Sequence, residues 1–458
     1  MEVFIEMNIL EKIKNLFEDR DLPKAKYQEN KAEFDSIIPK KVEAKYDKLE
    51  VELISASDSS YLVSMAARIC VGMDVVENYE DRISHLSRIL GRGHESILEH
   101  TNIVMVLHIP AHYHNLEYND FLQSLKYVDF KFSRTGNDLH MLVSGSIRGF
   151  KHILRNIKDV NHNIFAQKII ESLYYSTESV FFEDLIKDGI MNKESFTFVD
   201  NMKIVPITFK YSDEDNTEVG KVEHKTIDVE DIVSILATEH ASFEAIYEKV
   251  KKYGFTQEDM LDVAKVSVVF KNISRTASMQ MIRHRVGISQ ESQRYTNYTN
   301  KPFIEPLQFE NKVSKNDENI IDTTKTYKIT LFNTDIMITS QELGDELCKT
   351  YGQLFDQGMT KQNARAFLPS NVYTKLMMTF DYRHLMHFFN MRLDKAAQAE
   401  IRNVAICLDK AFREYDPKFD MLYEIADAPV YKLENENFDE MNKEIDEVIE
   451  EEIIEEEK

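Results

Sequence analysis

The sequence predicts an α+β protein, a mixed helix and sheet core with further helices around it. The 458 residues are 43% hydrophobic and 29% charged, which is ordinary globular composition and is enough for two to three cores, or for one core with a large insertion. Short apolar runs, such as residues 103–109, are typical of buried strands. Longer stretches with apolar residues every three or four positions are typical of amphipathic helices. The two patterns occur in turn along the chain.

The N-terminal part is predicted to begin with a helical extension over residues 1–46. A strand at LEVELISASD (49–58) comes next, followed by helices at SSYLVSMAARICVGM (59–73) and EDRISHLSRIL (80–90). The motif GHESILEH (93–100) then leads into a second strand, NIVMVLHI (102–109).

The sequence pattern changes after residue 110, and residues 111–263 are interpreted as a mixed α/β insertion. Within it, LHMLVSGSIRGFKHILR indicates strand, turn and helix, and residues 161–186 have a helical pattern. Residues 202–227 resemble a hairpin around an acidic turn. The core is predicted to consist of residues 47–110 and 264–430.

The second part of the core is predicted to open with a buried strand, KVSVVFKNI (265–273). A helix, SRTASMQMIRHR (274–285), follows with Ser274 as its N-cap. A long polar loop comes next, and then three helices are expected. They cover residues 337–358, residues 360–380 with a break at Pro369, and residues 381–415 with a bend near Arg392.

The charge of the chain is concentrated at its C-terminal end. The acidic tail, residues 431–458, carries nearly half of the formal net charge of −23. It is either a solvated segment or an exposed amphipathic helix that docks on a neighbour. The strong net negative charge of the chain argues against broad, non-specific nucleic-acid binding, because such binding needs many Lys and Arg side chains. Because there is no signal-peptide pattern and no apolar run of about 18 residues, we expect a cytoplasmic protein that does not enter a membrane.

Several kinds of chemistry find no support in the sequence. No phosphate-binding glycine motif and no GxSxG motif is present. The three cysteines are far apart, which indicates neither a disulfide framework nor a metal site. His94 and His100 lack the i,i+4 spacing of zinc ligands, and His384 with His387 lacks further ligands, so no metal is expected. Covalent catalysis through Ser or Cys is likewise not indicated.

Arginine, histidine and small polar residues remain as candidate functional groups. The stretch IRHRVGISQESQRYTN (282–297) gathers three arginines and one histidine among Ser, Gln and Glu residues. Like charges at this density repel one another unless an anion or carboxylates lie among them. Arginine presents a planar fork of donors that matches phosphate, so a nucleotide is one candidate partner. The alternative is a set of ion pairs on exposed helices, with carboxylates from Glu95, Glu99, Glu291 and Glu400.

The same stretch resembles the signature of the flavin-dependent thymidylate synthases, which read RHR, a spacer and then S-x-R-Y. The spacer here, VGISQE, is one residue shorter than the usual seven. GHESILEH resembles the first flavin-binding turn of that family. VFKNISRTASMQMIRHR and NARAFLPSNVYTKLMMTFDYRHLMHFFNMRLDKAAQAEIR resemble its later blocks in order and spacing. The resemblance implies the fold of that family, with residues 111–263 inserted into it.

The resemblance also implies roles for individual residues. Contacts to FAD are implied for His94, Ser96, Arg283, His284, Arg285, Gln290, Glu291, Asp381, Arg383 and His387. The look-alike His240 is the alternative to His94. Contacts to dUMP are implied for Gln280, Arg283, Ser292, Gln293, Arg294, Arg365 and Arg392. Arg392 and Ser292 are the implied catalytic residues, with Arg392 stabilising the anion that develops on the uracil ring.

The implied reaction is the reductive methylation of dUMP to dTMP, with methylenetetrahydrofolate as the carbon donor and NADPH as the reductant of bound FAD. Family members are homotetramers whose active sites combine residues of several subunits, so the same assembly is expected here. A non-catalytic nucleotide-binding sensor of the same fold is the alternative function.

Overall fold

The computed structural model describes residues 48–110, 116–196, 208–210, 219–221, 224–229, 232–238, 242–299, 301, 326–331, 333–394, 396–416 and 418–427. The predicted N-terminal extension, the acidic tail and His240 lie outside these described residues. Among the described residues, no helix is both long enough and apolar enough to cross a membrane.

The first sheet has four antiparallel strands in the order β1-β2-β4-β3. They are β1 (Glu50–Ala56), β2 (Ile103–Ile109), β3 (Val128–Thr135) and β4 (Asp138–Gly145). Every residue of β2 is buried. Side chains alternate between the two faces of a strand, so Met105 and Leu107 enter one hydrophobic core while Val104 and Val106 enter another. The sequence of β2, apolar at every position but His108, therefore reflects a strand that is covered on both faces.

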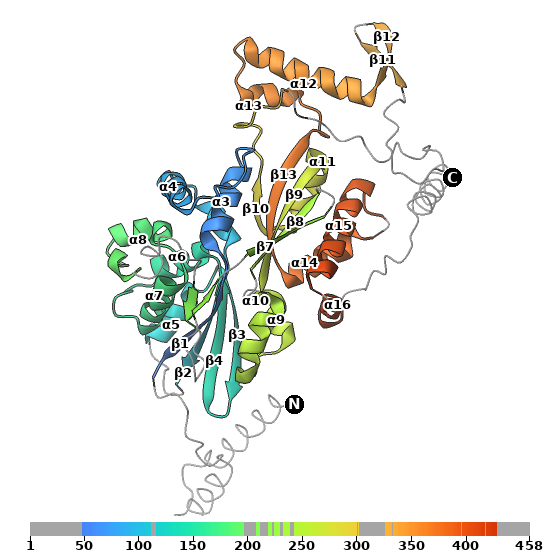
Figure 1. Ribbon diagram of the computed structural model, residues 1–458. Helices are drawn as coiled ribbons and strands as arrows, with labels where there is room; N and C mark the ends of the chain where they lie inside the picture. The colour runs from blue at the N-terminus through green and yellow to red at the C-terminus, as the bar shows by residue number, and fades with distance from the viewer. Residues whose placement is uncertain are drawn as a thin grey trace, which may run out of the picture.

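Helices cover the outer face of the first sheet (Figure 1). Polar side chains at Asp58, Asn78, Ser146 and Asn163 cap the starts of four of them by accepting backbone N–H bonds. The elements of this layer are α3 (Ser59–Ile69), α4 (Tyr79–Leu90), η1 (Glu95–His100), α5 (Leu116–Ser124), α6 (Ile147–Asn156), α7 (Ile164–Ser176), η2 (Ser179–Phe182), α8 (Glu183–Lys187) and η3 (Lys193–Ser195).

The second sheet has five strands in the order β10-β13-β9-β8-β7, again antiparallel. These are β7 (His224–Val229), β8 (Val233–Thr238), β9 (Lys265–Ser274), β10 (Gly287–Gln290) and β13 (Tyr373–Asp381). Figure 1 shows α14 and α15 beside this sheet. The associated helices are α9 (Phe243–Val250), η5 (Lys251–Tyr253), α10 (Gln257–Val263), α11 (Arg275–Met281), η6 (Ile282–His284), α14 (Tyr382–Arg392), α15 (Ala399–Tyr415) and α16 (Asp420–Ile425).

The remaining elements are two hairpins and a helical arm. The arm contains α12 (Ser340–Asp356), α13 (Lys361–Ala364) and η8 (Arg365–Phe367), and the hairpins pair β5 (Thr208–Lys210) with β6 (Val219–Lys221) and β11 (Thr326–Leu331) with β12 (Thr334–Thr339). The predicted α+β fold class is thus confirmed. The predicted helix over residues 360–380 is wrong in its second part, because residues after Pro369 form β13 in the middle of a sheet. Burial of Leu376, Met378 and Phe380 against the second core outweighs the helical propensity of Lys, Leu and Met.

The range 111–263 contributes strands to both sheets. It supplies β3 and β4 to the first sheet and β7 and β8 to the second. Consequently, its side chains pack in the same two cores as those of the flanking ranges. The division of the chain into a core and an insertion stays a prediction.

A buried polar seam joins η1 to the second sheet. The ring of His100 contacts the Thr379 hydroxyl through Nδ1 at 2.8 Å and the Ser289 hydroxyl through Nε2 at 2.9 Å. Ser267 continues the seam with a 2.7 Å hydrogen bond to Thr379. Burial lowers the pKa of His100 to about 3, so the ring is neutral at physiological pH. The last residue of GHESILEH is therefore a structural link between the two sheets.

We expect Gly149→Ala to destabilise the protein by roughly 1–3 kcal/mol, although alanine normally stabilises a helix interior by about 1 kcal/mol over glycine. A Cβ at position 149 would lie 2.5 Å from the backbone oxygen of Tyr127, and this backbone atom cannot rotate away. Thermal and urea unfolding measure the change. Asn156→Ala, at an exposed position of α6, is the control and should stay within about 0.5 kcal/mol of the wild type. Equal stabilities of the two variants would contradict this close approach.

Candidate active site

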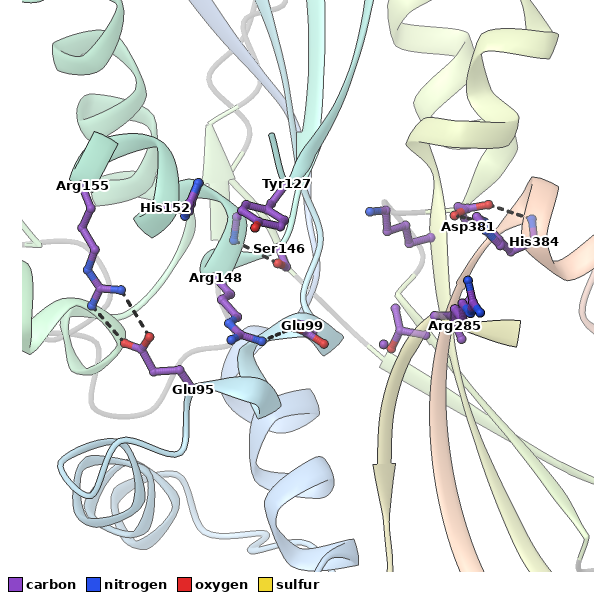
Figure 2. A pocket seen from close by; sticks show the side chains of 15 residues that line it. Glu95, Glu99, Tyr127, Ser146, Arg148, His152, Arg155, Arg285, Asp381 and His384 are labelled. Atoms are coloured by element: carbon purple, nitrogen blue, oxygen red, sulfur yellow. Dashed lines mark hydrogen bonds and ion pairs between the residues drawn. The ribbon is translucent and has the colours of Figure 1, made fainter. Parts of the chain in front are cut away.

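A cavity of about 520 Å³ opens between the two sheets. We call it the cationic pocket. One side comes from η1, α6 and Tyr127, and the other from β9, β10, β13, α14 and Arg285, as Figure 2 shows. The volume is in the usual range of ligand sites. Its lining residues are Glu95, Glu99, Tyr127, Ser146, Arg148, Gly149, His152, Arg155, Lys265, Arg285, Val286, Gly287, Thr379, Asp381 and His384.

Arg285 is the cation of this pocket that is most available to a ligand. Its guanidinium has no hydrogen-bond or ion-pair partner among the described residues. Its backbone adopts the left-handed conformation with φ 56° and ψ 36°. That conformation costs a residue with a Cβ roughly 1–2 kcal/mol. Strain of this kind is concentrated at functional sites. Arg285 thus fits the predicted role of contacting an anionic cofactor.

The other charges of the pocket neutralise one another in part. Asp381 caps α14 and accepts a 2.6 Å hydrogen bond from His384, which raises the pKa of that histidine. Lys265 pairs with Asp129 at 3.0 Å, and Arg148 forms an ion pair with Glu99. Burial alone would raise the pKa of Glu95, but hydrogen bonds from Arg155 and Lys151 lower it to about 2. The carboxylate of Glu95 is therefore occupied in an ion-pair cluster.

A second group of predicted residues gathers around Arg392. One of its members, His284, directly precedes Arg285 of the cationic pocket in the sequence. We call Gln280, His284, His387 and Arg392 the Arg392 cluster. Arg392 donates from Nε to Nε2 of His284 at 3.1 Å and from Nη2 to the backbone oxygen of Gln280 at 3.3 Å. Burial, followed by the charge of Arg392, lowers the pKa of His284 to about 4. Nε2 of His284 is thus the acceptor, and the proton of the neutral ring is on Nδ1.

The Arg392 cluster is held by neighbouring helices. The His387 ring lies 5.8 Å from the His284 ring, and the side chain of Gln280 bonds to Gln398. Arg283 is exposed and close enough to Arg392 to lower its pKa, after the larger effect of burial. The cluster presents guanidinium and amide groups at one place, a donor set suited to a planar polar ring.

A third group contains Ser292, Arg294 and Arg365. The Ser292 hydroxyl accepts from the backbone N–H of Arg294 at 3.2 Å, and Arg294 Nε donates to Gln362 at 3.1 Å. Arg365 is exposed on η8 and lies near Arg275, whose pKa is lowered mainly by burial and also by Arg365. Arg294 and Arg365 are thus two exposed guanidinium groups, a type of donor that suits phosphate.

The remaining predicted residues are engaged elsewhere or lie near these groups without lining the pocket. His94 and Ser96 are exposed on the η1 turn, beside Glu95. Arg383 forms a bidentate pair with Asp262 at 2.6 and 3.2 Å. Gln290 donates to Ser278 at 2.6 Å, whereas Gln293 is half-buried beside Ser292. Glu291 is buried and paired with Lys301 at 2.9 Å. The pocket therefore contains Arg285 and Asp381 of the predicted FAD set.

Sequence reasoning missed the contribution of α6 to the pocket. Arg148, His152 and Arg155 lie in the range that was interpreted as an insertion. One signal points to them: SIRGFKHILR has a capping serine followed nine residues later by arginine, and SRTASMQMIR has the same arrangement.

The two-sheet α+β fold thus contains a cationic pocket and, close to it along the chain, a cluster of arginine, glutamine and histidine side chains, groups whose chemistry suits phosphorylated aromatic ligands. Residues 208–418 match the family of the thymidylate synthase complementing protein. A flavin-dependent thymidylate synthase of Thermotoga neapolitana is 34% identical over 139 residues, 30% of this chain and 57% of that protein. One of Pyrococcus furiosus is 29% identical over 171 residues, 36% of this chain and 63% of that protein. Through this region, the chain is similar to the flavin-dependent thymidylate synthases. The matches span 57% and 63% of the length of these two relatives.

Proposed function

We propose that the protein is a flavin-dependent thymidylate synthase that methylates dUMP to dTMP. In this proposal methylenetetrahydrofolate donates the carbon, NADPH is the reductant, and no enzyme nucleophile is used. One observation carries the proposal: three consecutive residues, Arg283 to Arg285, connect two sites. Arg285 lines the cationic pocket, whereas His284 bonds to Arg392. A cofactor site and a substrate site that share one turn suit a reaction between two bound ligands.

The cationic pocket is the proposed FAD site. Arg285, Arg148 and Lys265 offer cations to phosphate groups, and Ser146, His384 and Asp381 offer polar contacts to a ring system. This donor set fits a flavin dinucleotide. When bound and reduced, FAD supplies the hydride. The protein's own task there is to hold the cofactor and exclude water.

The Arg392 cluster is the proposed uracil site. A permanent cation beside N3 and O4 of uracil stabilises the anion that makes C5 nucleophilic. Arg392 is held for this role by His284 and Gln280, while Ser292, Arg294 and Arg365 take the phosphate side. We further propose a cytoplasmic homotetramer, in which subunits share these sites.

The visible spectrum of the purified full chain tests the proposal. We expect a yellow protein with flavin absorbance that converts dUMP to dTMP when methylenetetrahydrofolate and NADPH are added. Colourless protein that binds dUMP without converting it would instead favour a nucleotide-binding sensor.

Substitutions at Arg285 and Arg294 should affect the binding of FAD and the binding of dUMP separately. Arg294→Ala should weaken dUMP binding by about ten- to a hundredfold, since it removes a charge-assisted hydrogen bond worth roughly 1.5–3 kcal/mol. It should leave bound FAD unchanged. Arg285→Gly should lower bound FAD and raise the stability of the apo-protein by about 1 kcal/mol, because glycine adopts φ 56° without strain.

Ligand titration and apo thermal unfolding measure these effects, with Arg285→Ala as the matched variant that keeps the backbone strain. If Arg285→Ala and Arg294→Ala lost several degrees of melting temperature while both affinities stayed intact, the arginines would be structural ion-pair partners.

A further inference from the structure

Eight of the fifteen residues that line the cationic pocket lie outside the matched range 208–418. Tyr127, Ser146, Arg148, Gly149, His152 and Arg155 form this side together with the η1 carboxylates. We call Tyr127, Arg148 and His152 the α6 wall. Figure 2 shows it opposite Arg285 and His384.

We propose that the α6 wall binds the adenosine and phosphate part of the dinucleotide, so that both sides of the cationic pocket contact FAD. This inference rests on the proposed function, because it assumes that a flavin occupies the cationic pocket. It adds a binding role for residues that lie outside the family signature.

Arg148 is the cation of this wall that can exchange partners. It pairs with Glu99, and both side chains are about half exposed, at 47% and 40%. Arg155 and the buried Lys151 are instead shared between Glu95 and Asp184, in a cluster of four charges. An exposed ion pair contributes little to stability. A phosphate can therefore replace Glu99 at Arg148 with little loss of folding energy.

The rings of Tyr127 and His152 give the wall an aromatic surface. Tyr127 is 66% exposed, and its ring meets that of His152 edge to face with centroids 4.3 Å apart. Exposed aromatic rings that line a cavity can stack on a nucleobase. The close approach of Gly149 to the Tyr127 carbonyl keeps this ring beside the first turn of α6. Phosphate contacts and a stacking surface thus lie side by side.

The strand-helix unit that contains α6 resembles the unit that contains α11, the helix before the RHR motif. Ser146 follows the last residue of β4 and caps α6 by accepting from the backbone N–H of Gly149. Ser274 is the last residue of β9 and caps α11 by accepting from the backbone N–H of Ala277. Arg155 and Arg283 each follow their capping serine by nine residues. The two strand-helix units are thus built alike, which is consistent with a binding role for both.

Fragment binding to the flavin-free full chain tests the proposal. FAD, ADP and riboflavin are titrated into wild type, Arg148→Ala, Tyr127→Ala and Tyr127→Phe, with flavin fluorescence for the flavins and calorimetry for ADP. We expect Arg148→Ala and Tyr127→Ala to weaken FAD and ADP by about tenfold or more and riboflavin by less than about twofold. Tyr127→Phe should bind FAD like the wild type, because it keeps the ring. Arg134→Ala, an exposed arginine of β3 outside the pocket, should change nothing.

Two results would contradict the proposed binding role of the α6 wall without contradicting the proposed flavin site. One is FAD affinity that stays unchanged in Arg148→Ala and Tyr127→Ala. The other is equal loss of FAD and riboflavin together with a lower melting temperature, which would indicate a structural role. If the wild type bound neither FAD nor riboflavin, the proposed function itself would fail, and the wall with it.

Discussion

Arg392→Lys should lower the single-turnover rate of dTMP formation by about a hundredfold at saturating dUMP, while dUMP affinity falls by less than about tenfold. Lysine keeps the charge, but its compact ammonium cannot reproduce the planar fork. Arg392 uses Nε to contact His284 and Nη2 to contact the Gln280 oxygen, and one ammonium cannot hold both positions. The loss should therefore appear in the transition state more than in substrate binding.

Single-turnover kinetics and a dUMP titration separate the two effects, and Arg134→Lys on the exposed edge of β3 is the control. The variant should keep its flavin, because Arg392 does not line the cationic pocket. Equal losses of rate and affinity would mean that Arg392 only anchors the substrate.

His100→Ala should destabilise the protein by roughly 2–4 kcal/mol, whereas His94→Ala should change its stability by less than about 0.5 kcal/mol. Both histidines belong to GHESILEH, but His94 is exposed and His100 is 1% exposed. Removing the His100 ring leaves a cavity and deprives the Thr379 and Ser289 hydroxyls of a partner. Urea unfolding at neutral pH measures both variants. Similar values for the two would contradict the role of the seam.

The buried ring of His100 also predicts that the stability of the protein depends on pH. The folded-state pKa of His100 is lowered to about 3, below the ordinary value of 6.5 in the unfolded chain. Between these values the unfolded state binds the extra proton, so stability is full above pH 6.5 and falls as the pH drops towards 3. The slope from this residue is at most about 1.4 kcal/mol per pH unit. His284 acts in the same direction. His100→Ala should flatten the slope between pH 6 and 4.5, and an unchanged slope would refute the assignment.

The sequence alone was enough to predict secondary structure where the local pattern and the burial of the residues agree. β1, β2 and β9 are segments of strand length rich in Val, Ile and other apolar residues, and α3, α4 and α11 have helical periodicity with polar caps. Their structure is set within a few residues of chain, so the fold class and the helix before the signature were predicted correctly. One helix with a bend near Arg392 was predicted over residues 381–415, whereas the chain there divides into α14 and α15.

Tertiary structure decided everything that depends on which distant segments meet. β13 is a strand because it fills the gap between β9 and β10, a fact that its own residues do not encode. Similarly, the sequence of α6 gives no sign that Arg148 would face Arg285 across a pocket, since 137 positions separate them and only the packing of the two sheets brings them together. Local sequence determined the residue types, caps and periods of this protein. The pairing of strands, the seam at His100 and the composition of the pocket follow from long-range burial, whose energy is shared by residues far apart in the chain.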